Sequence, residues 1–342
     1  MAAPKVCFDR VLPRNLFRPQ TLVRTRRGGP MRAVTRLGVL WMNGSTLRVK
    51  FMGGNASQKA TAKEQALWWT EHANLKFEFG TDPNSEIRIS FNANDGAWSY
   101  VGTDARDIPA NEATMNLGFL DGGTAGHEFG HAIGLAHEHQ NPAGGIQWNE
   151  REVIRALAGP PNFWDEATTR HNVLSKYQAD QVNGTNFDPA SIMLYFFPAE
   201  WTTNGIATNR NEILSSLDKE FTAGAKMYPK LGVVPDTATV IKVDDTKRTQ
   251  AEIGMPGEED IFKFKAASAG PYVIETRGNT DVVMKLFGPN SQTSVIAEDD
   301  DSGLSTNARI AKALSAGEYF VQIRHYNQES GKGKYSITVK KN

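Results

Sequence analysis

Residues 127–138 read HEFGHAIGLAHE, and the fold is organised around this stretch. His127 and His131 are four residues apart, so on a helix they lie one turn apart on the same face. Two imidazoles at this spacing can present their nitrogens to one point, which makes half of a tetrahedral zinc site. Glu128 follows the first histidine, where its carboxylate can reach a metal-bound water without binding the metal. The pattern predicts a zinc-binding helix.

Gly134 indicates where this helix ends, because glycine reverses the chain cheaply through a left-handed conformation. The turn would bring His137 round as a third ligand and leave the fourth position for water. That coordination is typical of catalytic zinc, whereas structural zinc sites have four protein ligands, most often with cysteine. The chain has 342 residues and one cysteine, so a closed structural site is hard to build. A chance match on an ordinary amphipathic helix is the alternative, but it would seldom place so many suitable residues in register.

Three motifs resemble those of one family. HExxHxxGxxH is similar to the metzincin signature, and the Glu138 that follows resembles the astacin branch of these zinc endopeptidases. Residues 191–195, SIMLY, resemble the astacin Met-turn, usually written SIMHY, and residues 96–102, GAWSYVG, resemble the GxWSxVG segment upstream of the zinc helix. The resemblance covers roughly residues 37–229. Leu194 departs from the histidine of the Met-turn, and we expect altered packing there because that position is not a ligand.

The resemblance implies an α+β zincin or metzincin catalytic domain, with a twisted mixed sheet and an active-site helix. It implies a zinc metalloendopeptidase that hydrolyses peptide bonds in proteins or peptides through a metal-activated water, with Glu128 as general base. It also implies that the phenol of Tyr195 moves between zinc and the tetrahedral intermediate, and that Met193 lies beneath the zinc as an apolar floor. Ordinary core packing is the alternative for both of these residues.

Hydrophobic periodicity predicts several elements around the motif. Alternating residues predict strands, and apolar stripes predict helices, one of them capped by Ser57. The expected strands are 46–51, 75–79 and 87–91, and the expected helices are 57–73, 149–158 and a closing helix that runs from 214 to Pro229. Residues 113–120 are expected to form the edge strand of the sheet. Its unpaired main-chain groups would bind an extended substrate.

Residues 1–36 predict an extended arm, because eight arginines and Lys5 stand against Asp9 alone, with prolines between them. Some metzincin zymogens close the zinc site with a propeptide cysteine, and astacin propeptides use an aspartate; Cys7 and Asp9 offer either group. We prefer to interpret Cys7 as a small apolar residue with no role, since free cysteine is commonly a buried hydrophobe. The competing hypothesis is an inhibitory arm in which Cys7 or Asp9 is the latency ligand.

The composition changes at residues 230–236, which predict a linker. Residues 237–342 then show short alternating segments with no helical pattern between them, which predicts an all-β sandwich. Segments such as DIFKFKA, GPYVIET and GEYFVQIRHY resemble the bacterial pre-peptidase C-terminal (PPC) domain, a module appended to secreted peptidases. The expected strands are 261–265, 270–276, 282–287, 294–297, 308–311, 317–324 and 334–339.

Glu298, Asp299, Asp300 and Asp301 form an acidic run, which Asp281 could join. Clustered carboxylate oxygens suit calcium, so these aspartates are candidate Ca²⁺ ligands. A solvated acidic turn that needs no ion explains the same residues equally well. Both interpretations remain open.

Charge and composition narrow the function further. The 38 lysines and arginines balance the 38 aspartates and glutamates, so nothing suggests a nucleic-acid or membrane-surface partner. No run approaches the ~18 apolar residues of a membrane span. The N-terminus lacks the apolar core of a secretory signal. Either a signal has been removed, or export takes another route, or the protein stays inside; of these we expect secretion.

The single cysteine rules out an intramolecular disulfide, which fits a bacterial relative of the disulfide-bonded animal astacins. A second functional hypothesis is a surface- or polymer-binding protein whose zinc domain is latent. The oligomeric state and the natural substrate stay open at this point.

Overall fold

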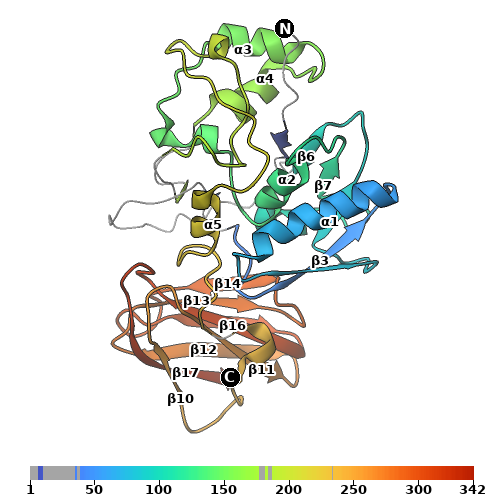
Figure 1. Cartoon of the computed structure of the whole chain (residues 1–342). Helices are drawn as coiled ribbons and strands as arrows, with labels where there is room; N and C mark the ends of the chain where they lie inside the picture. The colour runs from blue at the N-terminus through green and yellow to red at the C-terminus, as the bar shows by residue number, and fades with distance from the viewer. Residues whose placement is uncertain (1–6, 11–34, 37–38, 177–181, 184–186, 233) are drawn as a thin grey trace. The chain divides into compact units, whose positions relative to one another are not determined.

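The computed structural model describes residues 7–10, 35–36, 39–176, 182–183, 187–232 and 234–342 (Figure 1). Most of the predicted 1–36 arm therefore lies outside the described residues. The chain divides into two compact units, the first containing Leu47–His72 and Phe77–Phe221 and the second containing Thr222–Asn342. The first unit is α+β and the second is built from β-strands, so the predicted fold class is confirmed. The domain boundaries given above, with a linker at 230–236, stay predictions.

A six-stranded sheet forms the framework of the first unit. Alternation of apolar and polar residues explains its strands, since Leu47 and Val49 are fully buried while their neighbours are partly exposed. In spatial order the strands are β1 (Phe8–Asp9), β6 (Ala97–Ser99), β7 (Met115–Leu117), β5 (Ile87–Ser90), β3 (Thr46–Phe51) and β4 (Lys76–Gly80). The pairs β3–β5 and β5–β7 are parallel, β6 is antiparallel to β7, and β1 is parallel to β6.

The prediction that residues 113–120 form the edge strand is wrong. They contain β7, which lies between β5 and β6, with Ile89 paired to Met115 and Ala97 paired to Leu117. The chain passes from β5 out to β6 and returns to fill the gap between them, an order that local periodicity does not reveal. The outer position belongs to β6, and the two residues of β1 occupy its free side.

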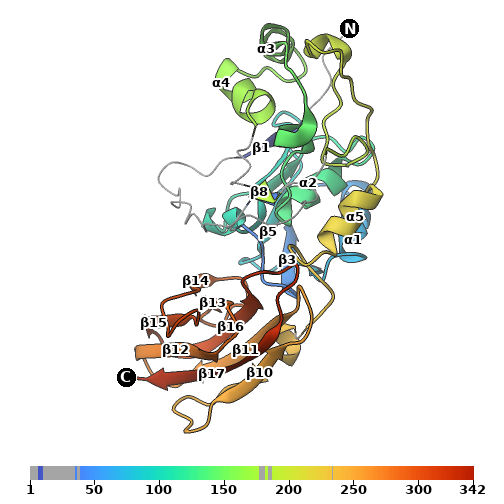
Figure 2. The ribbon, with the colours of Figure 1, turned by 90° about the vertical axis from the view of Figure 1, so that its left-hand side faces the viewer.

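Helices α1 (Ala56–Thr70) and α2 (Thr124–Ala132) lie side by side on one face of this sheet (Figures 1 and 2). Asn55, and not Ser57 as predicted, caps α1, because its side chain accepts from Gln58 N while the Gln58 side chain accepts from Asn55 N. The indole of Trp69 on α1 donates to Gly126 O on α2 at 2.7 Å. This bond fixes the separation of the two helices.

Gly130 lets α2 pack closely on the chain beneath it. A Cβ atom at this position would overlap Met193 Sδ and lie 2.9 Å from the Trp69 ring. Both of those side chains are buried. A larger residue at position 130 would therefore push α2 away from the residues below it.

The remaining helices of the first unit are short. The structure has helical segments at η2 (Gly102–Asp107), η3 (Glu138–Gln140), η4 (Pro142–Gly144), α3 (Glu150–Ala158), α4 (Glu166–Thr169), η5 (Arg170–Leu174), η6 (Ala199–Trp201) and α5 (Ser216–Thr222). The predicted helix at 149–158 is confirmed as α3. The closing helix is shorter than predicted, because Tyr228 N bonds Thr222 O across a turn that contains Gly224. None of the helices in the described ranges is long and apolar enough to cross a membrane.

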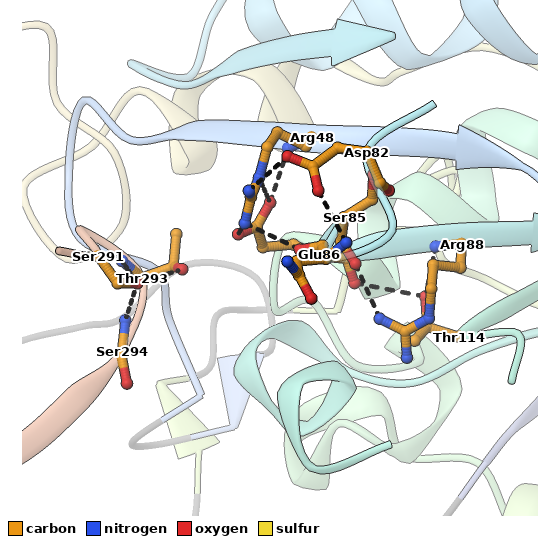
Figure 3. Close-up of polar contacts among 10 residues, drawn as sticks. Arg48, Asp82, Ser85, Glu86, Arg88, Thr114, Ser291, Thr293 and Ser294 are labelled. Carbon is orange, nitrogen blue, oxygen red and sulfur yellow. Dashed lines mark hydrogen bonds and ion pairs between the residues drawn. The ribbon is translucent and has the colours of Figure 1, made fainter. Parts of the chain in front are cut away.

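Arg88 on β5 holds the segment that leads into β7 (Figure 3). Its guanidinium donates to the carbonyl oxygens of Glu112, Ser85 and Ile108 at 2.7–3.0 Å. Its backbone N–H donates to Thr114 Oγ1 at 2.8 Å. A buried arginine with several backbone acceptors satisfies carbonyls that water cannot reach, so this connection is fixed although it contains little regular structure.

The second unit is a sandwich of two sheets around one core (Figure 2). Inward side chains of both sheets, such as Phe264, Ile274 and Ile337, pack in that core and are fully buried. One sheet contains β10 (Thr249–Ile253), β17 (Gly333–Lys341), β12 (Gly270–Gly278) and β15 (Arg309–Leu314). The other contains β14 (Val295–Asp299), β13 (Val282–Phe287), β16 (Gly317–His325), β11 (Glu259–Ala266) and β9 (Thr239–Val240).

All seven strands predicted for this region are present, and β9 and β10 were missed because they are short and largely polar. Their own residues show no alternation of apolar and polar side chains long enough to predict a strand, and they are strands because they pair with β11 and β17. The specific resemblance to the PPC domain stays a prediction.

Alanine normally stabilises a helix relative to glycine. At position 130 we expect the opposite, because α2 lies so close to Met193 that Gly130→Ala would cause a steric overlap. We expect the free energy of unfolding to fall by about 1–3 kcal/mol from overpacking, measured by urea denaturation. Gly80→Ala is the control, because a Cβ there has nothing within 4 Å. Equal stability of the two variants would contradict this description of the packing.

Asp260 in the sandwich gives a dependence of stability on pH. It is buried, accepts a 2.6 Å hydrogen bond from Tyr335 Oη, and burial raises its pKa from 3.8 to about 6. The folded state therefore binds this proton more tightly than the unfolded state. The stabilising contribution is complete below pH 3.8 and is lost as the pH rises through about 6.

We therefore expect Asp260→Asn, which keeps an acceptor for Tyr335, to exceed the parent in stability at pH 7.5 by about 1–3 kcal/mol. The difference should vanish near pH 4 in calorimetric unfolding of the full chain. Glu318→Gln, at an exposed position, should show no such change. A pH-independent difference for Asp260→Asn would rule out titration of this carboxyl as its cause.

Candidate active site

Helix α2 presents two imidazoles to one point. His127 and His131 are buried, and their Nε2 atoms lie 3.1 Å apart. The chain reverses as predicted at Gly134, two residues after the end of α2, where φ is +108° and a Cβ would lie 2.7 Å from Leu40. Only glycine fits this reversal without strain.

The reversal brings in the third imidazole. His137 is fully buried, and its Nε2 lies 3.0 Å from that of His131. The structure therefore brings the three histidines of the motif together, with their Nε2 atoms facing one another.

The hydrogen bond at Nδ1 of a histidine ring determines whether its Nε2 carries a proton or a lone pair. His127 Nδ1 lies 2.6 Å from Ile192 O, and His131 Nδ1 lies 2.8 Å from Leu135 O. A carbonyl only accepts, so both Nδ1 atoms carry the proton and both Nε2 atoms carry a lone pair. Two lone pairs facing each other at 3.1 Å repel unless a cation lies between them. The arrangement can therefore hold a metal ion.

The dimensions also fit zinc. Zinc–nitrogen bonds of about 2.0–2.1 Å in a tetrahedron separate the ligand nitrogens by about 3.3 Å. The observed separations of 3.0 and 3.1 Å agree within a few tenths of an ångström. Neutral imidazoles whose other nitrogen is held by a carbonyl are ordinary zinc ligands.

Cys7 lies at the fourth corner of this cluster. Its Sγ is 2.8 Å from His127 Nε2 and 3.2 Å from His137 Nε2, and the residue is buried. The preferred interpretation of Cys7 as a small apolar residue does not describe this geometry, because its thiol faces two imidazoles across 120 and 130 residues of sequence. The position of the Asp9 side chain lies outside the described part of the chain.

Glu128 and Tyr195 lie on two sides of the cluster. Glu128 is fully buried on α2 next to His127, and it lines a cavity with Cys7, Tyr195 and Arg210. Tyr195 is 4% exposed, its ring centroid lies 4.3 Å from that of His137, and its hydroxyl donates to Cys7 O. Both groups can reach a molecule that takes the place of Cys7.

Asp218, which sequence reasoning missed, holds the Met-turn in place. It accepts from Ser191 Oγ at 2.7 Å and from Ile192 N at 2.9 Å, and burial raises its pKa. Ile192 in turn supplies the carbonyl that binds His127. Met193 is buried against α2, as the resemblance implies for a floor beneath the cluster. The only feature of the sequence that could have indicated this contact is the presence of an acidic residue in the closing helix.

Glu138 connects the third histidine to the same segment. Its N–H donates to Met193 O at 2.9 Å, and its carboxylate accepts from Asn141 Nδ2 and Asp188 N, both at 3.0 Å. Burial raises its pKa to about 7. In this chain the carboxylate serves as an internal brace for the loop that carries His137.

His139 points away from the cluster. Its Nε2 lies 2.9 Å from Asn172 O, and its ring stacks on Tyr195 with 4.2 Å between centroids. It supports the position of the tyrosine and adds no fourth nitrogen.

The candidate calcium residues lie at one end of the sandwich. Asp299 Oδ1 accepts from Ser302 N and Arg309 N at 3.1 and 2.7 Å. Burial, with a contribution from Asp301 and Asp300, raises the pKa of Asp281. Among the residues that the structure describes, the one convergent group of three or more such ligands is Cys7 with the three histidines. Calcium binding stays a prediction.

Comparison with known proteins agrees with this geometry. Residues 35–219 match the family model described as Astacin, which is a peptidase family. A solved structure of myroilysin is 36% identical with a TM-score of 0.55, and the match covers 58% of this chain and 99% of that one.

Two curated relatives match the same region. Tolloid-like protein 1 of Mus musculus is 31% identical over 170 residues, which are 48% of this chain and 15% of that protein. Protein SpAN of Strongylocentrotus purpuratus is 31% identical over 150 residues, 41% of this chain and 22% of that protein. The chain thus spans 15–22% of the length of these two relatives.

The family model covers more than half of the chain, and the myroilysin match extends over nearly all of that structure. Myroilysin and this chain share the α+β fold around α2. The chain belongs to the astacin family of peptidases.

Proposed function

We propose that this protein is a zinc-dependent endopeptidase that is held latent by its N-terminal arm. The observation that carries the proposal is the convergence of three imidazole Nε2 atoms beside the buried carboxylate of Glu128. Family membership makes zinc the expected metal, since astacins are zinc peptidases. Proteins or peptides are the proposed substrates.

His127, His131 and His137 would hold the zinc ion. When bound, zinc polarises a carbonyl group and makes a water molecule acidic enough to act near neutral pH. Glu128 takes the proton of the attacking water and passes it to the leaving amine. Its buried position beside His127 suits this role, because a general base must lie within hydrogen-bond reach of the proton that it removes.

Tyr195 supplies a hydrogen-bond donor for the substrate. Its hydroxyl now donates to the carbonyl oxygen of Cys7, a peptide carbonyl next to the cluster. With the arm withdrawn, the same donor would face the carbonyl of the scissile bond. A donor placed where negative charge develops stabilises the transition state by about 3 kcal/mol.

Cys7 would close the site in the intact chain. A thiolate is a strong zinc ligand, and the position of Sγ beside two imidazoles leaves no room for a substrate carbonyl. Activation would then require that residues 7–10 leave the site. We further propose that the enzyme is secreted, as its membership of the astacin family favours, and bacterial, since its single cysteine cannot form the intramolecular disulfides of the animal astacins.

A surface- or polymer-binding protein with a latent zinc domain is the second candidate, because Cys7 at the cluster would close the site permanently if the arm never leaves. Catalysis distinguishes the two. In a Cys7→Ser chain, whose site the thiol no longer closes, a casein-zymogram band that o-phenanthroline abolishes supports the peptidase, whereas a metal-replete Cys7→Ser chain that never cleaves casein supports the binding protein.

Replacement of Glu128 tests the general base. In the Cys7→Ser chain, whose site the thiol no longer closes, we expect Glu128→Ala to retain zinc, measured by metal analysis, and to lose about 10²–10⁴-fold in casein turnover. Glu64→Ala, on the exposed side of α1, is the matched control and should keep full activity. A zinc-loaded Glu128→Ala enzyme that cleaves at the parental rate would show that another group moves the proton.

Replacement of Cys7 tests latency. Serine is a far weaker zinc ligand, so we expect full-length Cys7→Ser to cleave casein about tenfold faster than the untreated parent, which corresponds to about 1.4 kcal/mol of arm binding. Cys7 is the single cysteine, so alkylation gives a second measurement. Iodoacetamide should label the zinc-loaded parent slowly and the chelated parent quickly. Equal labelling rates with equal activities would exclude a zinc–thiolate bond.

A further inference from the structure

Arg10 of the N-terminal arm lies in a separate site that Asp95 and Trp98 form. Two contacts from the Arg10 guanidinium reach Asp95, at 3.0 Å to Oδ2 and 3.2 Å to Oδ1. The same guanidinium lies 3.9 Å above the centroid of the Trp98 ring. An acid that accepts from the guanidinium and an aromatic ring beneath it together favour an arginine.

This site is built by the catalytic unit, not by the arm. The indole N–H of Trp98 donates to Asp95 Oδ2 at 2.9 Å, and Asp95 N donates to Asn92 O at 3.1 Å. The Trp98 ring also contacts Tyr100 edge to face, with centroids 6.0 Å apart and an angle of 83°. The acid and the ring are thus held by each other and by their neighbours when Arg10 leaves.

The site lies along the strand that borders the cluster. Trp98 is on β6, where Phe8 pairs with Trp98 and Asp9 with Ser99, and Arg10 N donates to Ser99 O at 3.3 Å. Arg10 is three residues from Cys7, which corresponds to about 10 Å along an extended chain. A substrate that pairs with β6 after the arm has left would pass the same acid and ring.

We propose that Asp95 and Trp98 form a specificity subsite for a substrate arginine about three residues from the scissile bond, which Arg10 fills in the latent chain. The inference rests on the proposed peptidase function. It goes beyond that function by naming a side chain that the enzyme prefers and the residue that selects it.

Arginine suits this site better than lysine. The planar guanidinium lies over the Trp98 ring while its Nη2 meets both carboxylate oxygens of Asp95, whereas an ammonium group is a compact, strongly hydrated charge with no planar face to stack on the ring. The side chains of Arg10 and Asp95 are each 37% exposed. The expected preference is therefore moderate, because solvent screens the ion pair.

The competing explanation is that the site serves only to hold the arm. A full-length chain carrying Cys7→Ser and Arg10→Ala separates the two, because neither the thiol nor the guanidinium then retains the arm. In this chain we would compare fluorogenic peptides that carry arginine, citrulline or lysine at successive positions on either side of the scissile bond. Citrulline has the shape of arginine without its charge.

We expect a preference at one peptide position, on the side of the scissile bond whose residues pair with β6. There, arginine should exceed citrulline and lysine in kcat/KM by about fivefold to tenfold, mainly through KM. Adding Asp95→Asn should bring this ratio near one, while asparagine keeps an acceptor for the Trp98 indole. Glu78→Gln, on the exposed strand β4 at the opposite end of the sheet, removes the same charge and should leave the ratio unchanged. Peptide Kd values measured by fluorescence anisotropy on the same chain with Glu128→Ala should show the same ratio.

Equal kcat/KM values for arginine and citrulline at every position, or a preference that survives Asp95→Asn, would overturn the subsite. Zinc-dependent cleavage of the same peptides would still support the proposed peptidase function. If zinc-loaded protein cleaves none of the peptides, the proposed function fails and the subsite fails with it.

Discussion

Two backbone carbonyls determine what the histidine cluster can do. Ile192 O and Leu135 O accept from the Nδ1 atoms of His127 and His131, which leaves both Nε2 atoms with lone pairs aimed at one point. One carbonyl comes from the Met-turn and the other from the residue just after Gly134. The histidine cluster therefore depends on two loops as much as on the helix that carries His127 and His131.

Those loops are in turn fixed by buried carboxylates. Asp218 binds Ser191 and Ile192, and Glu138 binds Asn141 and Asp188 N. Irregular segments cannot satisfy their own backbone groups, so acidic side chains supply the acceptors that a helix or sheet would provide. Gly130 completes the arrangement, because the absence of a side chain lets α2 lie directly on Met193. Rigid support of this kind is what a site needs to hold its ligands in one geometry.

Sequence patterns over a few residues predicted the individual helices, strands and turns, because these depend on neighbouring residues. The spacing of His127 and His131 and the position of Gly134 define the helix and its end, and period-two alternation found seven strands of the second unit. The order of β6 and β7 was not predicted, since strand order depends on pairing between distant segments. The surroundings of Cys7 were missed for the same reason, because its contacts span 120 residues or more. No pattern near Asp95 indicated that Arg10 would reach it.

The pairing of β1 with β6 has a consequence for the newly made protein. A sheet that ends in an open strand offers its free backbone groups to any other chain, and such edges promote aggregation. In this molecule the two residues of β1 already occupy that border. The segment that brings Cys7 to the cluster therefore also covers the β6 border of the sheet in a freshly folded chain, for as long as the two residues of β1 stay paired.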